Sequence, residues 1–318
     1  MFCSNCPRRC NADHSKCVGW CRSDDRINVS SIVLHKGEEP PLSGEKGIVN
    51  LFFPSCNMSC VYCQNHQISE RGTSGVIMTL DEVCDAIAEL LPLSEGNLGF
   101  VSPTHYVVQV ISIVKELRRR GLHPVIVYNS NGYELPETIK MLEDIVDVWL
   151  PDFKYSDDRL AEELSAAPGY SAFALPSLKG MVHQRGVTLQ LNERNIAQSG
   201  VIVRHLVLPG AMSNSIGVLK LIAEEVTPNL HISLMSQYYP PEGNKRMTTI
   251  ETQAIRSGNN QSVRQVSALH RTITRREYEE VVDAFHAFGF SKGWIQDFES
   301  HRSYRPDFSK RDPFNQIQ

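Results

Sequence analysis

Long apolar runs are missing from this sequence. No stretch of the 318-residue chain approaches the roughly 20 apolar residues that a membrane-spanning helix needs. The first residues, Met1-Phe2-Cys3, contain no apolar signal region, so we expect no secretion. These two absences predict a cytoplasmic protein without a membrane partner.

An excess of either charge is missing as well. The chain has 32 Lys and Arg against 36 Asp and Glu, a formal net charge of −4, which gives no argument for a nucleic-acid or membrane partner. We find no internal repeat and no low-complexity tract. The hydrophobic fraction of 41% and the charged fraction of 21% are typical of a globular protein whose core needs no disulfides.

Cysteine, by contrast, is concentrated. Eight of the nine cysteines form two groups: Cys3, Cys6, Cys10, Cys17 and Cys21, then Cys56, Cys60 and Cys63. Cys84 stands alone within a helical pattern and is interpreted as a buried apolar residue. A disulfide scaffold would be short and rich in loops, which this chain is not. In a reducing compartment, the two groups indicate metal or iron–sulfur sites.

Short apolar runs alternate with helical patterns after the first group. The runs are rich in Val, Ile and Leu on both faces, as buried parallel strands are. The predicted strands are Gly47–Pro54, Leu98–Val101, Pro124–Tyr128, Val146–Leu150, Val201–Leu208 and His231–Ser236. Capping boxes at Thr79/Glu82 and Thr274/Glu277 begin two helices. The pattern predicts an α/β fold, either a doubly wound sheet or a partial (β/α)6 barrel, with the chemistry at the carboxyl ends of the strands.

The second cysteine group directly follows the first predicted strand. Its spacing is Cys56-x3-Cys60-x2-Cys63, with the aromatic Tyr62 before the last cysteine. Three thiolates can hold three irons of a [4Fe-4S] cluster and leave the fourth iron open. An open iron suits the amino and carboxylate groups of S-adenosylmethionine (SAM). An electron passed into the sulfonium would break a C–S bond and give a 5′-deoxyadenosyl radical, which abstracts hydrogen from a substrate.

Two simpler interpretations compete with this one. A structural zinc site normally has four ligands, and no fourth Cys or His has suitable spacing, although His66 is near. The three cysteines would otherwise be unliganded loop residues, which their density disfavours.

Here the sequence resembles the radical SAM superfamily, and its surroundings resemble the pyruvate formate-lyase activating enzyme-like branch, which includes members of unassigned substrate. The segments that carry the resemblance run in order along nearly the whole chain: Glu39–Gly44, Cys63–Asn65, Ser102–His105, Tyr128–Tyr133, Leu150–Tyr155, Arg204–Gly210, Met235–Tyr238 and Trp294–Asp297. The resemblance implies a partial (β/α)6 TIM-type barrel, a [4Fe-4S] cluster, SAM, and an electron donor such as flavodoxin or ferredoxin.

The resemblance also implies a set of cofactor contacts at the strand ends. Ser102 stands where the branch has a Gly-Gly-Glu-like segment that contacts the SAM amine. Asn129, Ser130 and Asn131 occupy the place of an Asp-Thr-Asn motif, whose Asp and Thr help to bind a monovalent cation. The expected cofactor-binding residues are Tyr62, Ser102, Asn129, Ser130, Asn131, Asp152, Lys154, Arg204 and Gln237.

Residue chemistry supports some of these assignments and leaves alternatives. Asp152 and Lys154 flank a phenylalanine and point to one face of an extended chain; their alternative is a solvated ion pair. Arg204 and His205 point to opposite faces of a strand. An inward Arg204 would pair with a carboxylate, and an outward one would cover a helix.

The N-terminal cysteines form a second candidate site. The family-like frame uses Cys3, Cys6, Cys10 and Cys21 and leaves Cys17 spare. Four thiolates without an open position would make a closed structural zinc site, and the same ligands would serve a second Fe–S cluster. We expect residues 1–35 to be a Cys-rich metal-binding segment, 36–298 the partial barrel and 299–318 a C-terminal tail.

The substrate is left open by the sequence. One hypothesis is a glycine of a glycyl-radical enzyme, which makes that enzyme a protein partner; another is a small metabolite. Nucleic-acid modification is disfavoured, because the basic stretch Lys245, Arg246, Arg256, Arg264, Arg271, Arg275 and Arg276 lacks interleaved aromatic residues; we expect Gly243–Ala268 to form a long polar loop. A non-catalytic metal-binding scaffold is the remaining alternative.

Overall fold

The parallel strands of the main sheet follow one another in chain order. The computed structural model describes residues 3–241, 245–257, 260–302, 305–310 and 312–314. Within these residues the sheet order is β11-β10-β9-β7-β6-β5-β3-β2. All neighbours pair in parallel except β2, which is antiparallel to β3. The strands are β2 (Ser31–His35), β3 (Ile48–Phe52), β5 (Asn97–Val101), β6 (Val125–Asn129), β7 (Val148–Trp149), β9 (Ala197–Leu206), β10 (His231–Met235) and β11 (Gly293–Ile295).

This strand order differs from that of a doubly wound sheet. A doubly wound sheet reverses its strand order at a switch point, and this sheet never reverses. The predicted α/β fold with a parallel sheet is confirmed, and the sequential order is the one that a partial barrel has. The sheet stays open, with β2 and β11 as its two edges.

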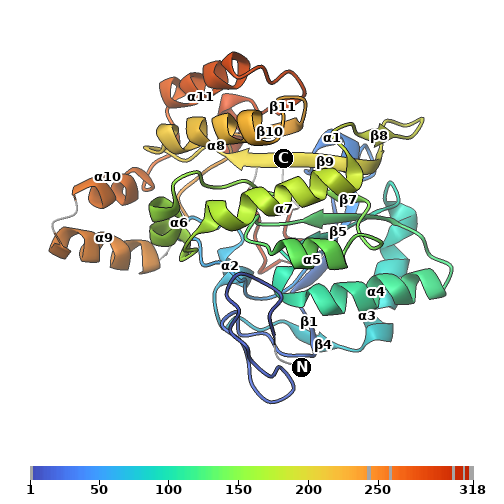
Figure 1. The fold of residues 1–318 in the computed structure, drawn as a ribbon. Coiled ribbons are helices and arrows are strands. Elements are labelled where there is room, and N and C mark those ends of the chain that lie inside the picture. Colours follow the sequence, from blue (N-terminus) through green and yellow to red (C-terminus); the bar gives the residue numbers. More distant parts are fainter. Residues whose placement is uncertain (1–2, 242–244, 258–259, 303–304, 311, 315–318) are drawn as a thin grey trace.

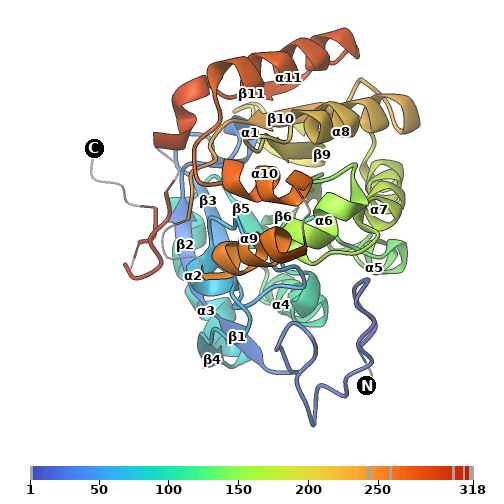
Figure 2. The ribbon, with the colours of Figure 1, turned by 90° about the vertical axis from the view of Figure 1, so that its left-hand side faces the viewer.

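Helices cover the outer side of the sheet. Figure 2 shows α4, α5, α7, α8 and α11 in an arc around the strands, as successive right-handed crossovers require. The helices are α1 (Pro40–Ser43), α2 (His66–Ser69), α3 (Leu80–Leu90), α4 (Val107–Arg119), α5 (Pro136–Met141), α6 (Asp158–Ser165), α7 (Tyr170–Arg185), α8 (Met212–Glu225), α9 (Lys245–Ser257), α10 (Asn260–Ala268) and α11 (Arg275–Ala287). None of those in the described part of the chain is both long and apolar enough to cross a membrane.

Both predicted capping boxes are present. The Thr79 hydroxyl accepts from the Glu82 backbone N–H and the Glu82 carboxylate accepts from the Thr79 backbone N–H, which fixes the start of α3. Thr274 and Glu277 do the same for α11. A cap of this kind contributes about 1 kcal/mol.

The prediction of a long loop over Gly243–Ala268 is wrong. Its described residues form α9 and α10, which lie at the end of the molecule toward which the β9 arrow points (Figure 1). Their apolar residues are too sparse for the helical period to stand out, but Met247 and Val266 are buried in the core. Residues 243–244 and 258–259, and the side chains of Lys245 and Arg246, lie outside the described residues.

Smaller strands accompany the sheet. β1 (Ile27–Val29) and β4 (Val76–Met78) form a separate antiparallel pair, and β8 (Gln190–Leu191) pairs with β9. The boundary expected after residue 35 lies at the end of β2, and β2 belongs to the main sheet. The Cys-rich segment therefore leads directly into the sheet at Ser31.

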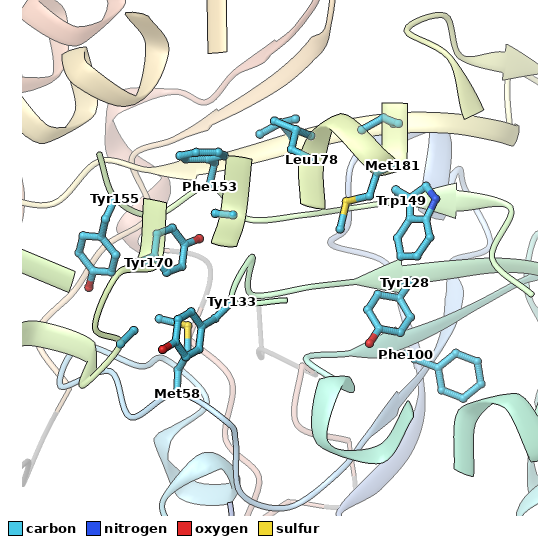
Figure 3. Close-up of a cluster of buried hydrophobic side chains, with 14 of the residues drawn as sticks. Met58, Phe100, Tyr128, Tyr133, Trp149, Phe153, Tyr155, Tyr170, Leu178 and Met181 are labelled. Carbon is cyan, nitrogen blue, oxygen red and sulfur yellow. The ribbon is translucent and has the colours of Figure 1, made fainter. Parts of the chain in front are cut away.

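The core reaches from the sheet to the cysteine loop. Trp149 and Tyr128 pack edge to face beneath α7, with centroids 5.3 Å apart. Further along the same cluster lie Tyr133, Tyr170 and Met58 (Figure 3). Met58 lies between Cys56 and Cys60, so the loop is anchored by a fully buried side chain, worth about 1.5–3 kcal/mol.

Candidate functional site

The loop with Cys56, Cys60 and Cys63 lies at the carboxyl end of β3, before α2. Ser55 turns the chain there with φ = +66°, an uncommon conformation for a residue other than glycine. Polar groups contact each sulfur: the Met58 N–H donates to Cys56 Sγ at 3.3 Å. Ser165 Oγ donates to Cys60 Sγ at 3.0 Å, and Ser69 Oγ lies 3.0 Å from Cys63 Sγ. Hydrogen bonds to sulfur are the outer contacts that tune Fe–S clusters.

Cys56 and Cys63 have raised pKa values, so their thiols would ionise readily only with a metal bound. Burial raises the pKa of Cys56 to about 12, and the neighbouring Cys60 and Cys63 thiolates add to the increase. Burial likewise raises the pKa of Cys63 to about 11. Binding iron would supply the positive charge that ionisation of such thiols lacks. No three or more Cys, His, Asp or Glu side chains within the described ranges are placed to hold a single metal ion; in a cubane each thiolate holds a different iron.

A cavity of about 600 Å³ adjoins this loop. Nine of the residues proposed from the sequence lie in its wall: Cys60, Cys63, Tyr62, Ser102, Asn129, Asp152, Lys154, Arg204 and Gln237. They come from the ends of β3, β5, β6, β7, β9 and β10. The strand order thus brings together side chains that are far apart in the sequence, at the edge where an α/β sheet binds ligands.

A chain of alternating charges crosses the wall of the cavity. Lys154 Nζ lies 2.6 Å from Asp152 Oδ2, Arg204 Nε lies 2.9 Å from Asp152 Oδ1, and Arg204 NH1 lies 3.1 Å from Glu38 Oε2. The four side chains are only 11–17% exposed, so the alternative of a solvated ion pair does not hold. Burial alone would raise the pKa of Asp152, but Lys154 and Arg204 outweigh it and lower this pKa.

Arg204 points into the sheet's concave side rather than toward a helix. Its NH2 donates to Asn129 Oδ1 at 2.9 Å, which joins the ends of β6 and β9. Coulombic attraction from Asp152, Glu39 and Glu38 raises the pKa of Arg204 although burial opposes it. His205, on the opposite face, is buried and lies 2.7 Å from the Phe153 carbonyl oxygen through Nδ1.

In the loop after β6, the side chains of Asn131 and Ser130 point to different partners. Asn131 Nδ2 donates to Cys56 Sγ at 3.4 Å, while Ser130 Oγ turns away and donates to Glu134 Oε1 at 2.8 Å. Neither side chain lines the cavity. Gly132 has φ = +82°, and a Cβ there would lie 2.2 Å from Tyr170 Oη and 2.3 Å from the Asp152 carbonyl oxygen. Only glycine fits this turn.

Ser102 and Gln237 are held by their surroundings. Ser102 has φ = +47°, and its N–H donates to the Asn129 carbonyl oxygen at 2.7 Å. Gln237 joins two other glutamines: its Nε2 donates to Gln64 Oε1 at 3.2 Å, and its Oε1 accepts from Gln296 Nε2 at 2.8 Å. Gln64 follows Cys63, so this row of amides connects β10 and the chain after β11 to the cysteine loop.

Several cavity residues were missed from the sequence. Glu38, which binds Arg204, also accepts from Asn50 Nδ2 at 2.9 Å; a polar Asn50 in an apolar strand was the available signal. Arg305 and Phe314 of the tail also line the cavity. The Phe314 ring lies 3.9 Å from His35 on β2, so the tail reaches from the β11 side of the open sheet to its other edge.

The N-terminal thiols lie near one another. Burial raises the pKa of Cys3, and Cys10 and Cys21 raise it further. Burial raises the pKa of Cys6 to about 12, again with contributions from Cys21 and Cys3. A Cβ on Gly19 would lie 3.1 Å from Cys10 Sγ and 3.7 Å from Cys21 Sγ, so a glycine here leaves room for both sulfurs. Cys17 is exposed.

Comparisons with known proteins give distant similarities. No family model matches the sequence. An uncharacterized protein of Methanocaldococcus jannaschii is 29% identical over 261 residues, which cover 77% of this chain and 70% of that protein. A putative glycyl-radical enzyme activating enzyme of Haemophilus influenzae is 25% identical over 115 residues, 36% of this chain and 43% of that protein.

Solved structures share part of the fold at low sequence identity. SuiB of Streptococcus suis, bound to S-adenosylmethionine, is similar with a TM-score of 0.49 and 11% identity, covering 79% of this chain and 51% of that one. A spore photoproduct lyase variant has a TM-score of 0.49 and 9% identity, covering 81% of this chain and 76% of that one. The chain thus spans about half the length of SuiB.

Proposed function

We propose that this chain is a radical SAM enzyme whose cluster loop is Cys56–Cys63. The observation that carries the proposal is one cavity that receives both this loop and the polar strand ends of five neighbouring strands. A [4Fe-4S] cluster held by Cys56, Cys60 and Cys63 would supply, with SAM bound, the electron that cleaves SAM to a 5′-deoxyadenosyl radical.

The chain's own residues would bind and orient SAM. Lys154 presents an ammonium group at the cavity wall, where it can attract the SAM carboxylate. Asp152 and Arg204 hold Lys154 and Asn129 in place through the contacts described above. Gln237 and Ser102 line the same cavity, and Ser102 has a left-handed conformation. A backbone group of Ser102 would contact the SAM amine.

A direct test follows anaerobic reconstitution with iron and sulfide. The expected results are four irons per cluster loop and 5′-deoxyadenosine after addition of SAM and dithionite, measured by mass spectrometry. Cys60→Ala should abolish the product, while Cys17→Ala, which changes an exposed cysteine, should retain it. Absence of deoxyadenosine from the parent protein would favour the metal-binding scaffold instead.

For the substrate, we propose a glycine of a polypeptide, as in activation of a glycyl-radical enzyme. The support is the description of the Haemophilus influenzae relative. A small metabolite is the second candidate, and the specific observation in its favour is that the tail residues Arg305 and Phe314 also line the cavity.

Deuterium transfer distinguishes the two substrate classes. The host organism's cells are grown in deuterated medium, and their extract is separated into a protein fraction and a small-molecule filtrate. Each fraction is added with SAM and reductant, and deuterium in 5′-deoxyadenosine is measured. Transfer from the protein fraction supports the polypeptide, and transfer from the filtrate alone supports the metabolite.

A further inference from the structure

Arg8 connects the N-terminal cysteines to the cluster loop. It lies between Cys6 and Cys10 in the sequence, yet its Nε donates to the Asn57 carbonyl oxygen at 2.9 Å and its NH2 donates to the Ala166 carbonyl oxygen. One planar guanidinium therefore holds two backbone segments that come from distant parts of the chain.

Both segments adjoin proposed cluster ligands. Asn57 directly follows Cys56. Ala166 follows Ser165, whose hydroxyl donates to Cys60 Sγ at 3.0 Å. The Arg8 guanidinium is also within electrostatic range of the Cys56 sulfur. Arg8 thus acts on two of the three sulfurs, through the backbone and through its charge, without touching a metal.

Aromatic rings fix the Arg8 guanidinium in place. Its Cζ lies 3.6 Å from the centroid of the Trp20 ring and 5.3 Å from that of Tyr133. Trp20 in turn contacts Arg71, whose Cζ lies 4.4 Å from the same ring and whose Nε donates to the Trp20 carbonyl oxygen at 3.1 Å. Stacking of arginine on an aromatic face is favourable, and Arg71 follows α2, the helix just after the cluster loop.

The residues around Arg8 and Trp20 are the N-terminal thiols. Cys6 and Cys10 flank Arg8, and Cys21 follows Trp20.

We propose that Arg8 is a positioning residue that sets the stability and the reduction potential of the [4Fe-4S] cluster, through the two backbone segments that it holds and through its charge. This inference rests on the proposed function. The guanidinium fork keeps the cluster loop closed around its iron, and the positive charge favours the reduced, more negative cluster.

The test measures two properties of the reconstituted protein. One is the rate at which a chelator removes iron from the cluster loop, and the other is the cluster midpoint potential from an EPR-monitored redox titration. Arg8→Gln should lose iron roughly 10-fold faster or more, as changes in outer contacts of metal ligands do, and should have a more negative potential. Arg9→Gln is the matched control, since it removes the same charge from an adjacent exposed side chain.

A conservative variant separates the charge from the fork. Arg8→Lys should keep the potential of the parent, because the charge remains, but should lose iron as fast as Arg8→Gln, because one ammonium cannot replace two directed N–H groups. A merely structural role would move both properties together. Circular dichroism shows whether Arg8→Gln folds. If it does not, Arg8→Lys alone tests the proposal: its potential should equal that of the parent while its iron is lost faster.

The two proposals fail in different ways. A parent protein that assembles no [4Fe-4S] cluster at Cys56–Cys63 contradicts the proposed function. A parent that cleaves SAM, with Arg8→Gln indistinguishable from Arg9→Gln in both properties, contradicts only the role of Arg8.

Discussion

Arg204 and Asp152 are 52 residues apart in the sequence, yet Arg204 Nε lies 2.9 Å from Asp152 Oδ1. They also form an isolated parallel β-bridge just beyond the paired part of β7. The pair holds two neighbouring strand ends at one edge of the cavity, and Lys154 and Glu38 extend it on either side. The same four charged side chains therefore hold the cavity wall in place and neutralise one another's buried charges.

Removal of Arg204 should destabilise the fold. Arg204→Met leaves Glu38 without its cation, whereas Asp152 keeps Lys154. Breaking one partner of a buried pair costs about 3–5 kcal/mol, so the free energy of unfolding, measured by urea denaturation, should fall by about 3 kcal/mol. Arg204→Lys, which retains the charge, should lose less.

The control for this prediction is Arg119→Met. Arg119 pairs with Glu116 at 2.7 Å, but its side chain is 72% exposed, so the loss should stay below about 1 kcal/mol. Equal losses for Arg204→Met and Arg119→Met would mean that the buried network does not stabilise the fold.

Much of the fold was predictable because it rests on local signals. The apolar runs that became β3, β6 and β10 have no competing interpretation, and Thr79/Glu82 and Thr274/Glu277 specify helix starts by their spacing alone. β11 was not predicted, because Gly293–Ile295 is short, and neither were α9 and α10, because their apolar stripes are narrow.

The candidate site was predictable only in part. Cysteine spacing and the strand-end motifs identify Cys60, Asp152 and Lys154 as polar residues at one edge of the sheet. Glu38 was missed because its partner, Arg204, lies on a strand far along the chain. The tail residue Phe314 was missed for a related reason: no pattern near it indicates that it packs on β2.

Lys154 is expected to contribute to SAM affinity. Lys154→Met removes the ammonium but leaves Asp152 bound to Arg204, so the cavity wall should survive. Loss of a charged hydrogen bond costs about 1.5–3 kcal/mol, which corresponds to roughly 10–100-fold weaker SAM binding, measured by calorimetry on reconstituted protein. The iron content should not change.

A second lysine serves as the control for SAM binding. Lys179→Met removes an exposed ammonium on α7 that pairs with Glu225 at 2.9 Å and does not line the cavity. It should bind SAM as the parent does. If Lys154→Met bound SAM as tightly as the parent, Lys154 would not be a SAM-binding residue.

Glu134 should make stability depend on pH. It is fully buried, and burial raises its pKa from 4.5 to about 7, although hydrogen bonds from Thr104 and Ser130 oppose the increase. A raised pKa in the folded state contributes stability below pH 4.5 that is lost as the pH rises through 7. At about 1.4 kcal/mol per pH unit, the loss is about 3 kcal/mol.

Glu134→Gln isolates this contribution, because the amide keeps the size and cannot ionise. The difference in free energy of unfolding between parent and variant should shift by about 3 kcal/mol against the parent as the pH rises from 4.5 to 7. Parallel stability curves for the two proteins would show that Glu134 does not titrate in this range.

Deletion of residues 305–318 should expose the proposed cluster to solvent. In the tail, the Phe308 N–H donates to Gln67 Oε1 on α2 at 2.6 Å, and the Phe308 ring lies 5.2 Å from that of Phe52 on β3. The tail therefore covers the open side of the sheet next to the cluster loop. Without it, the iron–sulfur absorption of the reconstituted protein should bleach in air several-fold faster. Lys310→Ala, which truncates an exposed side chain of the same tail, should bleach at the parent's rate, and equal bleaching of the deleted chain would show that the tail shields nothing.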